Sequence, residues 1–201
     1  MTVLDQLREA IGDAYVLTGA DTAKWRSDWT GDYVLNPMAV LRPGSTADVA
    51  AILKIANETA TPVVPVSGNT GLTGATSNDG ALMLSLDRMN AIRGVDPEGR
   101  SIIVEAGAVL SAIHDAAEAH GLIFPLTFGA RGTAMIGGAL STNAGGSNVL
   151  RYGNTRDLCM GVEVVLPDGR VMDLMSELHK DNSGLNLRNL VIGAEGTLGV
   201  I

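Results

Sequence analysis

Cysteine and basic residues are scarce in this chain of 201 residues, and each shortage excludes a class of protein. Cys159 is the only cysteine, which rules out an internal disulfide framework and any metal cluster held by cysteines alone. A single thiol is typical of a reducing compartment, so we expect a cytoplasmic protein. Lysine and arginine number 14 against 22 aspartates and glutamates, and the resulting formal charge of −8 argues against nucleic-acid binding.

Long hydrophobic runs are also missing. No apolar stretch approaches the roughly 18 residues of a membrane span, so we expect no spanning helix. Asp5, Arg8 and Glu9 interrupt the apolar core that a signal peptide needs, and we expect no secretory signal. Because 46% of the residues are nevertheless hydrophobic, the chain has enough apolar surface to bury a core.

Several common catalytic motifs are absent as well. The sequence has no Gly-Lys-Ser/Thr phosphate loop, no His-Glu-x-x-His metal motif and no Gly-x-Ser-x-Gly nucleophile elbow. His114 and His120 lie six residues apart on opposite faces of a predicted helix, so they do not share a metal ion. We therefore expect no metal site, structural or surface roles for all three histidines (the third is His179), and a buried, inert thiol at Cys159.

Glycine, by contrast, is abundant. The chain has 25 glycines and only seven aromatic residues (two Trp, three Tyr and two Phe), whereas glycine usage averages roughly 7%. Disorder is a poor explanation because the chain is too apolar. The glycines also cluster, which indicates places where the backbone comes close to a ligand.

Hydrophobic spacing predicts an α+β fold with two lobes. Residues 3–11 have helical spacing that ends at Gly12, and Ser45 is a candidate cap for a helix that begins beside it. That helix lies between strands at 38–41 and 63–66, which we expect to be parallel. Further along we expect strands at 81–86 and 102–106, helices at 110–121 and 185–192, and a hairpin of 162–166 with 171–174.

The first glycine-rich loop, residues 67–74 (Ser-Gly-Asn-Thr-Gly-Leu-Thr-Gly), follows a predicted strand and leads into another strand. A Rossmann loop would lead into a helix and bind pyrophosphate at that helix's N-terminus. The alternative for an anion is a nest, in which successive backbone N–H groups converge on the ligand. An ordinary mobile loop explains the loop by itself equally well, and both readings stay open at this point.

Two more glycine-rich segments follow, at residues 129–146 and 193–199. Tight packing of a helix through small residues would explain Gly137 and Gly138 but not the Asn-Ala-Gly-Gly run at 143–146. A helix cap and turn would explain the third segment. Three such segments in one small domain favour a long ligand threaded between two lobes, such as a dinucleotide with a large ring system.

The order of these motifs resembles a known family. The motifs are Val-Pro-Val-Ser-Gly-Asn-Thr-Gly (64–71), Ile-Gly-Gly-Ala-Leu-Ser-Thr-Asn-Ala-Gly-Gly (136–146), Leu-Arg-Tyr-Gly (150–153), Val-Glu-Val-Val-Leu-Pro-Asp-Gly (162–169) and Gly-Ala-Glu-Gly-Thr-Leu-Gly (193–199). Together they resemble the FAD-binding domain of the vanillyl-alcohol oxidase and p-cresol methylhydroxylase superfamily. Asp-Trp-Thr at 28–30 and Lys-Asp-Asn-Ser-Gly at 180–184 make the chain most similar to the D-2-hydroxyglutarate and D-lactate dehydrogenase branch.

The resemblance implies a two-lobed PCMH-type (p-cresol methylhydroxylase-type) FAD-binding domain over residues 36–201. A parallel β-α-β lobe (about 36–95) would be followed by a mixed and antiparallel lobe with flanking helices (about 96–201). Residues 1–35 would be a helical extension, and the substrate domain of the family would lie outside this chain. The implied cofactor is FAD, bound non-covalently because Asn69 stands where covalent members of the family often have a histidine.

The resemblance also assigns cofactor-binding residues. The pyrophosphate would lie on Ser67, Gly68, Asn69, Thr70, Gly71 and Leu72. The flavin side would be lined by Pro125, Gly129, Thr133, Gly137 and Gly138, and the isoalloxazine or ribityl region by Asn143, Ala144 and Gly146. The adenosine end would lie near Gly196 and Ile201. The chain offers no plausible general base beside these loops, so the catalytic residues remain unknown.

The implied activity is oxidation of a D-2-hydroxy acid by hydride transfer to flavin N5. The implied partners are a small 2-hydroxy acid of the D-2-hydroxyglutarate, D-lactate or glycolate type, an electron acceptor (a quinone, a cytochrome or an electron-transfer flavoprotein) and a second copy in a homodimer. Two alternatives remain open. One is a different flavin reaction, such as sugar-lactone oxidation or the flavin subunit of an electron-transfer complex. The other is a non-catalytic flavin-binding or assembly module.

Overall fold

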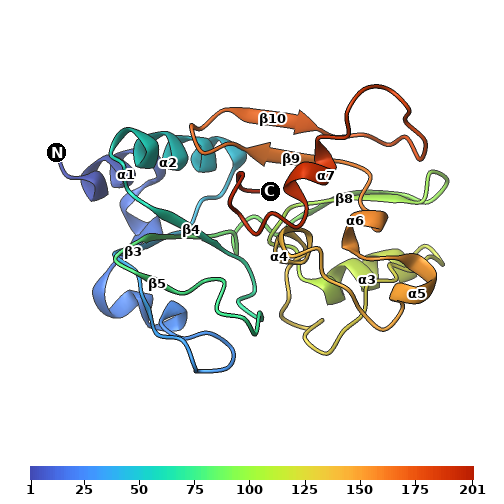
Figure 1. Cartoon of the computed structure of the whole chain (residues 1–201), viewed down its shortest axis with the longest axis horizontal. Helices are drawn as coiled ribbons and strands as arrows, with labels where there is room; N and C mark the ends of the chain where they lie inside the picture. Colours follow the sequence, from blue (N-terminus) through green and yellow to red (C-terminus); the bar gives the residue numbers. More distant parts are fainter.

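A four-stranded sheet organises the first half of the chain in the computed structural model, which describes residues 1–201 (Figure 1). Its strands are β1 (Val16–Leu17), β3 (Ala39–Leu41), β6 (Leu82–Ser85) and β4 (Val63–Val66), in the order β1-β3-β6-β4. β3, β6 and β4 are parallel, and β1 is antiparallel to β3. Helix α2 (Thr46–Glu58) connects β3 to β4, which confirms the predicted strand–helix–strand unit, with β6 inserted between its two strands.

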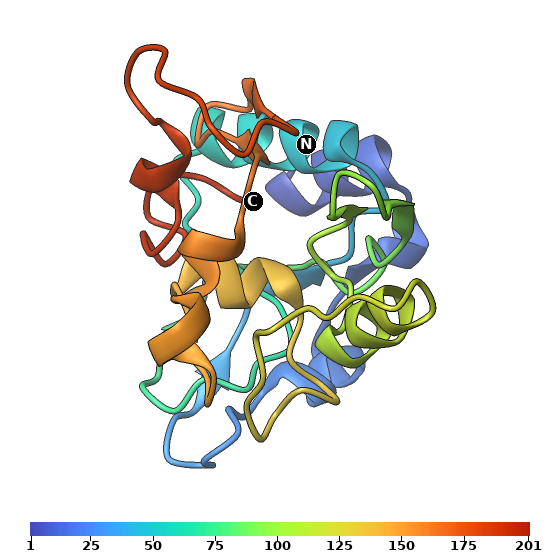
Figure 2. The same ribbon diagram turned by 90° about the vertical axis from the view of Figure 1, so that its right-hand side faces the viewer.

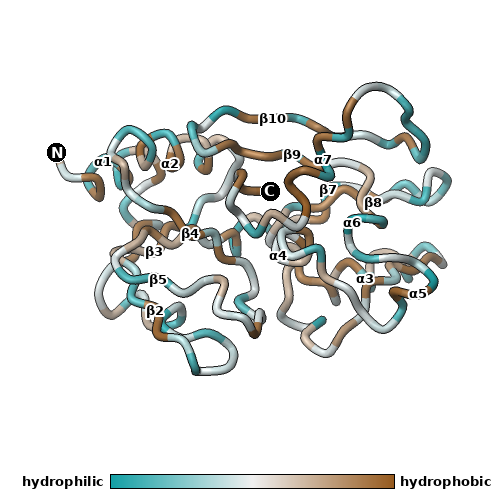
Figure 3. The backbone as a smooth tube through the Cα atoms, in the orientation of Figure 1, coloured by the Kyte–Doolittle hydropathy of each residue, from teal (hydrophilic) through white to brown (hydrophobic).

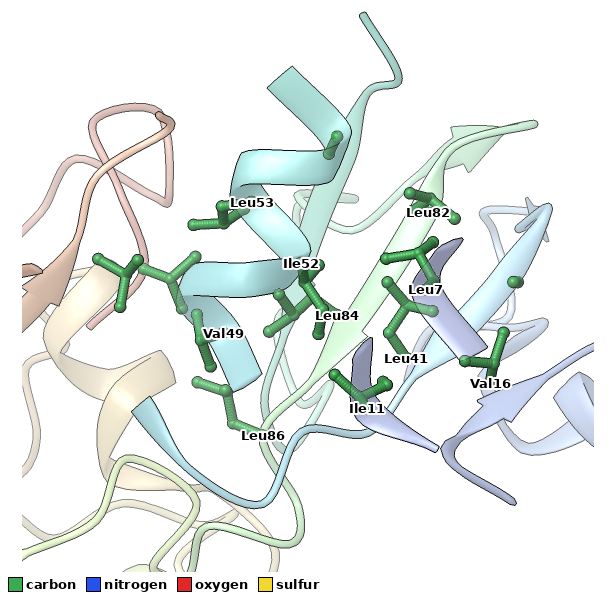
Figure 4. Close-up of a cluster of buried hydrophobic side chains, with 14 of the residues drawn as sticks. Leu7, Ile11, Val16, Leu41, Val49, Ile52, Leu53, Leu82, Leu84 and Leu86 are labelled. Atoms are coloured by element: carbon green, nitrogen blue, oxygen red, sulfur yellow. The ribbon is translucent and has the colours of Figure 1, made fainter. Parts of the chain in front are cut away.

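Each face of this sheet has its own hydrophobic core. On one face, α1 (Val3–Ile11) and α2 pack against the strands, and Leu7, Ile52 and Leu84 are fully buried there (Figure 4). On the other face, Trp25, Leu35 and further side chains of the sheet bury a smaller cluster beside η2 (Gly19–Trp25). The remaining elements of this lobe are η1 (Asp13–Tyr15) and the parallel pair β2 (Leu35–Asn36) and β5 (Asn78–Asp79).

The start of α2 follows from one side chain. The hydroxyl of Ser45 accepts a hydrogen bond from the backbone N–H of Asp48 at 3.1 Å, as the sequence pattern predicts for an N-cap. We expect Ser45→Ala to cost about 1 kcal/mol of stability, which corresponds to roughly 2–4 °C in Tm for a chain of this size. Thermal unfolding measures this. Ser111→Ala removes a hydroxyl near the start of α3 (Leu110–Glu118) that makes no hydrogen bond, and it should leave Tm unchanged or slightly raised.

The second lobe is built from two antiparallel hairpins and short helices (Figure 2). Its elements are β7 (Ile92–Asp96) paired with β8 (Ser101–Val104), α3 (Leu110–Glu118), α4 (Ile136–Ser141), α5 (Val149–Tyr152), α6 (Thr155–Leu158), β9 (Val162–Val165) paired with β10 (Val171–Leu174), and α7 (Arg188–Val191). Leu110, Ile113 and Ile192 are buried in its core. The hairpin of β9 and β10 and the helix at 110–118 were both predicted, and the α+β class is confirmed.

The hairpin of β9 and β10 joins the two lobes (Figure 1). Its turn lies against α2, where a Cβ at Gly169 would lie 2.7 Å from the carbonyl oxygen of Ala50. The backbones of Val165 and Val200 exchange hydrogen bonds of 2.8 and 2.9 Å, and both side chains belong to the core of the first lobe. The last residues of the chain are therefore held between the lobes.

The structure places some segments differently from the sequence prediction. Residues 1–35, predicted as a helical extension, pack onto the first lobe: α1 supplies Leu7 and Ile11 to the first core, and β1 joins the sheet. Strand β7 was not predicted, and it pairs with β8 across the expected lobe boundary at 95. Its side chains are mostly exposed, so hydrophobic alternation gave no signal for it.

Hydropathy follows this architecture. Figure 3 shows the hydrophobic stretches concentrated on strands and inner segments, whereas many outer loops are hydrophilic. The longest helix, α2, has 13 residues, and no helix combines the length and the apolar character that crossing a bilayer would require.

Candidate functional site

A cavity of about 320 Å³ lies where the three glycine-rich segments meet. That volume is at the lower end of the range for small-molecule pockets. The wall consists of residues 65–72, 74–76, 86, 128, 134–135, 137–139, 141–142, 144–145, 195–196 and 199–201. Segments from both lobes and from the C-terminus thus form one site.

The loop after β4, most of which lines this cavity, has free backbone hydrogen-bond donors. None of the backbone N–H groups of residues 68–74 donates to an acceptor within the chain. Asn69 has a left-handed φ of +49°, and such a change of hand along the backbone is typical of an anion-binding nest. The hydroxyls of Ser67 and Thr70 lie in the same wall.

The side-chain amide of Asn69 anchors this loop through both of its polar atoms. Asn69 Nδ2 donates to the carbonyl oxygen of Ser27 at 3.0 Å, and the Thr76 hydroxyl donates to Asn69 Oδ1 at 2.8 Å. Gly74 lies against the ring of Tyr33, where a Cβ would be 2.5 Å from the nearest ring carbon. The loop is therefore held in shape by the segment before β2, which favours the nest over an ordinary mobile loop.

The supporting segment is itself ordered by a buried carboxylate. The Thr30 hydroxyl donates to Asp28 Oδ2 at 2.6 Å, and this hydrogen bond lowers the pKa of the Asp28 carboxyl. The backbone N–H groups of Gly31 and Tyr33 donate to Asp28 Oδ1 and act in the same direction. Asp28 thus fixes the turn that positions Tyr33 beneath the loop.

Close contacts within the chain explain several of the glycines. A Cβ at Gly68 would overlap the carbonyl oxygen of Thr133, and a Cβ at Gly137 would lie 2.8 Å from the Cβ of Ala106. The backbone N–H of Gly138 donates to Ser67 Oγ at 3.3 Å, so the first loop and α4 are in direct contact. Glycine at 68 and 138 allows the first loop to approach the second lobe, and glycine at 137 allows α4 to pack on Ala106 within that lobe. Tight packing through small residues therefore does explain Gly137 and Gly138.

The third segment reaches the cavity through hydrogen bonds to the end of α4. The N–H of Gly193 donates to the carbonyl oxygen of Leu140 at 3.0 Å, and that of Glu195 donates to Ser141 at 2.9 Å. Gly196 lies against Pro65, where a Cβ would be 3.1 Å from the proline Cγ. These contacts bring Glu195 and Gly196 beside the first loop.

Most of the predicted cofactor-binding residues line the cavity. They are Ser67, Gly68, Asn69, Thr70, Gly71, Leu72, Gly137, Gly138, Ala144, Gly196 and Ile201. The predicted residues that lie outside the wall are Pro125, Gly129, Thr133, Asn143 and Gly146.

Three of these five residues make contacts with other parts of the protein. Asn143 Oδ1 accepts a hydrogen bond from the N–H of Arg156 at 3.0 Å, and the carbonyl oxygen of Pro125 accepts one from Asn148 at 3.1 Å. A Cβ at Gly146 would overlap the carbonyl oxygen of Thr127. Their assignment to the flavin side remains a prediction.

Several wall residues were not predicted, and only some of them lie in segments that the sequence pattern singles out. Glu195 lies inside a motif that the sequence analysis singled out. Met135 lies inside the second glycine-rich segment, whereas Phe128 and Leu86 carry no local signal, because the packing of distant segments brings them to the cavity. They add to the apolar surface that Val66, Leu72 and Ile201 give to the wall.

Ionisable groups are nearly absent from the wall. Glu195 is its only titratable side chain, and no histidine, cysteine, tyrosine, lysine or arginine belongs to it. His114 Nε2 and His179 Nε2 lie 2.8 and 3.0 Å from backbone carbonyl oxygens elsewhere. Burial raises the pKa of the Cys159 thiol, consistent with the inert role predicted for it.

The chemistry of the wall fits a dinucleotide with a flat ring. Free N–H groups and hydroxyls suit a diphosphate and sugars, and apolar side chains suit a ring system. Gly71 has no atom within 4 Å of an added Cβ, so the chain itself does not require glycine there. A ligand lying against this wall residue would account for it.

Comparison with known proteins gives the same result. A family model described as an FAD binding domain matches residues 37–175. D-2-hydroxyglutarate dehydrogenase of Xanthomonas citri pv. viticola is 44% identical over 183 residues, which are 90% of this chain and 39% of that protein. D-lactate dehydrogenase of Anaerostipes hadrus is 42% identical over 166 residues, 82% of this chain and 35% of that protein.

Solved structures share the fold. A structure of alkyldihydroxyacetonephosphate synthase superposes with a TM-score of 0.86 at 18% identity, covering 98% of this chain and 38% of the other. At that identity the likeness concerns the fold alone. The present chain spans well under half the length of these curated relatives.

Proposed function

The chain belongs to the family of FAD-binding domains, and from that premise we propose that it is the cofactor-binding part of a flavoprotein dehydrogenase acting on a D-2-hydroxy acid. One observation carries the cofactor site: three glycine-rich segments meet in one cavity whose wall offers a run of free backbone N–H groups. The substrate class rests on the names of relatives that are more than 40% identical to this chain. D-2-hydroxyglutarate and D-lactate are therefore the first substrates to test, followed by glycolate.

FAD, when bound, supplies the hydride acceptor for oxidation of the substrate. The residues of this chain bind and orient it. We propose that the N–H groups of residues 68–74 hold the diphosphate and that Asn69, through Ser27 and Thr76, keeps them aligned. The wall contains no cysteine, histidine or tyrosine to form a bond to the flavin, and this supports non-covalent FAD.

A proton acceptor for the substrate hydroxyl is not evident among the histidines of this chain, since none of them lines the cavity. We propose that this base and the groups that bind the substrate carboxylate belong to a substrate domain outside these 201 residues. The further partners that we propose are an electron acceptor (a quinone, a cytochrome or an electron-transfer flavoprotein) and a second copy in a homodimer. The proposed compartment is the cytoplasm, as the single cysteine favours.

FAD binding by the purified chain tests the proposal. At free FAD of about ten times Kd, we expect a stabilisation of about 1.4 kcal/mol and a rise in Tm of roughly 3–6 °C. Because no lysine or arginine lines the cavity, the affinity should not weaken between about 0.05 and about 0.5 M NaCl. Acid precipitation should release all of the flavin into the supernatant.

Three results would count against this proposal. Failure of FAD to raise Tm or to co-purify would remove the cofactor assignment. A steep loss of affinity with salt would show that cations outside the cavity wall hold the phosphates. A flavin that binds but that neither hydroxy acid reduces, once the full-length protein is used, would favour another flavin reaction or a non-catalytic module.

A further inference from the structure

Glu195 is the one charged side chain in the cavity wall, and it carries the wrong sign for a diphosphate. Its carboxylate takes part in none of the ion pairs of the chain, which involve other residues throughout. It also accepts no hydrogen bond from any side chain or backbone group of the protein. The carboxylate is therefore available to a ligand.

The backbone at Glu195 adds a second observation. Its φ is +53°, a left-handed conformation that favours glycine, and both Gly193 and Gly196 nearby have left-handed φ angles. Glu195 is held in this conformation by the hydrogen bond from its N–H to Ser141. Glycine would adopt this backbone conformation with less strain. The presence of glutamate at this position therefore suggests that its side chain has a function.

Electrostatics limits what this role is. A carboxylate beside a phosphate would repel it, and no cation in the wall offsets that repulsion. Glu195 is an exposed residue of the wall, so its carboxylate is accessible to solvent and to a ligand, and the parts of the ligand that it contacts favourably are those that donate hydrogen bonds. Its two oxygens accept several hydrogen bonds, which matches the adjacent hydroxyls of a sugar, and acidic residues recognise ribose hydroxyls in this way in other dinucleotide sites.

We propose that Glu195 is a specificity-determining residue that accepts hydrogen bonds from sugar hydroxyls of the bound dinucleotide. The proposal rests on the FAD site proposed above and adds a role for a residue of its wall. Two sources of hydroxyls exist in FAD, the ribose of the adenosine half and the ribityl chain of the flavin half. The experiment below distinguishes them.

The test measures the Kd of FAD for the wild-type chain, for Glu195→Gln and for Glu177→Gln. Glutamine keeps the Cβ and the backbone conformation, so the first variant removes the charge and replaces one acceptor oxygen with an NH2 donor. Glu177 is an exposed carboxylate outside the cavity wall, and its variant makes the same change in net charge. We expect Glu195→Gln to raise Kd about tenfold, because hydrogen bonds to a charged group are stronger than neutral ones. Glu177→Gln should change Kd less than about twofold.

Competition with ADP and with FMN locates the hydroxyls. A weaker ADP affinity in Glu195→Gln assigns the adenosine ribose, and a weaker FMN affinity assigns the ribityl chain; either result supports the proposal. An unchanged Kd for FAD, or a tighter one after removal of the negative charge, would overturn it while leaving the FAD site intact. Absence of FAD binding by the wild-type chain would instead overturn the proposed function together with this inference.

Discussion

Replacing Gly68 with alanine is expected to destabilise the chain and to weaken FAD binding at the same time. The added Cβ would overlap the carbonyl oxygen of Thr133 and would lie 3.0 Å from the Cα of Ala134. Both neighbours are backbone atoms of the other lobe, so no side-chain rotation relieves the overlap. Forcing extra atoms into such a contact typically costs 1–3 kcal/mol, and with backbone on both sides we expect about 2–3 kcal/mol.

The effect on Tm should be a loss of roughly 4–12 °C for a chain of this size. FAD affinity should fall with it, because the displaced loop carries the free N–H groups of the site. Thermal unfolding of the chain without cofactor and titration with FAD separate the two effects. Gly132→Ala is the matched control, since Gly132 has open space around an added Cβ and no left-handed φ. A Gly68→Ala protein as stable as this control would contradict the close approach of the two lobes.

Local signals predicted the parts of the fold that depend on neighbouring residues in the chain. Gly12 ends α1 with a φ of +92°, and Ser45 caps α2, so both helices begin or end where short-range chemistry places them. The same holds for the loop after β4. Residues 67–72 were predicted to bind the cofactor, and all six line the cavity because they follow one strand end without interruption.

The rest of the site depends on contacts between distant residues, which a single sequence does not reveal. Asn143 was predicted to approach the flavin, but its side chain accepts a hydrogen bond from Arg156, thirteen residues away. Gly146 packs on Thr127, and Gly68 packs on Thr133, so glycine marks contacts within the protein as well as contacts with a ligand. Composition alone does not separate these two uses of glycine. The added-Cβ contacts identify the glycines that the packing of the protein itself requires, such as Gly68, whereas the open space at Gly71 and at Gly132 shows that no neighbouring atom of the protein requires glycine there.

That distinction leads to the prediction with the largest effect on binding. Gly71 lies in the cavity wall, has no left-handed φ and has no atom within 4 Å of an added Cβ. Gly71→Leu should therefore leave the Tm of the cofactor-free chain within about 2 °C of the wild type, since neither packing nor backbone conformation opposes it. The leucine would cover the N–H groups on which we place the diphosphate. Hydrogen bonds to charged groups contribute about 1.5–3 kcal/mol each, so the loss of two should weaken FAD binding more than about a hundredfold.

Two measurements on Gly71→Leu and on Gly132→Leu decide this prediction. Gly132 is likewise open to an added Cβ but does not line the cavity, so its variant should bind FAD as the wild type does. If both variants fold and only Gly71→Leu loses FAD, the backbone of the first loop is the diphosphate site. If Gly71→Leu keeps its affinity, the diphosphate lies elsewhere in the cavity, and the glycine at position 71 needs another explanation. A fall in the Tm of the cofactor-free Gly71→Leu chain would mean that the space beside Gly71 is filled by the protein itself.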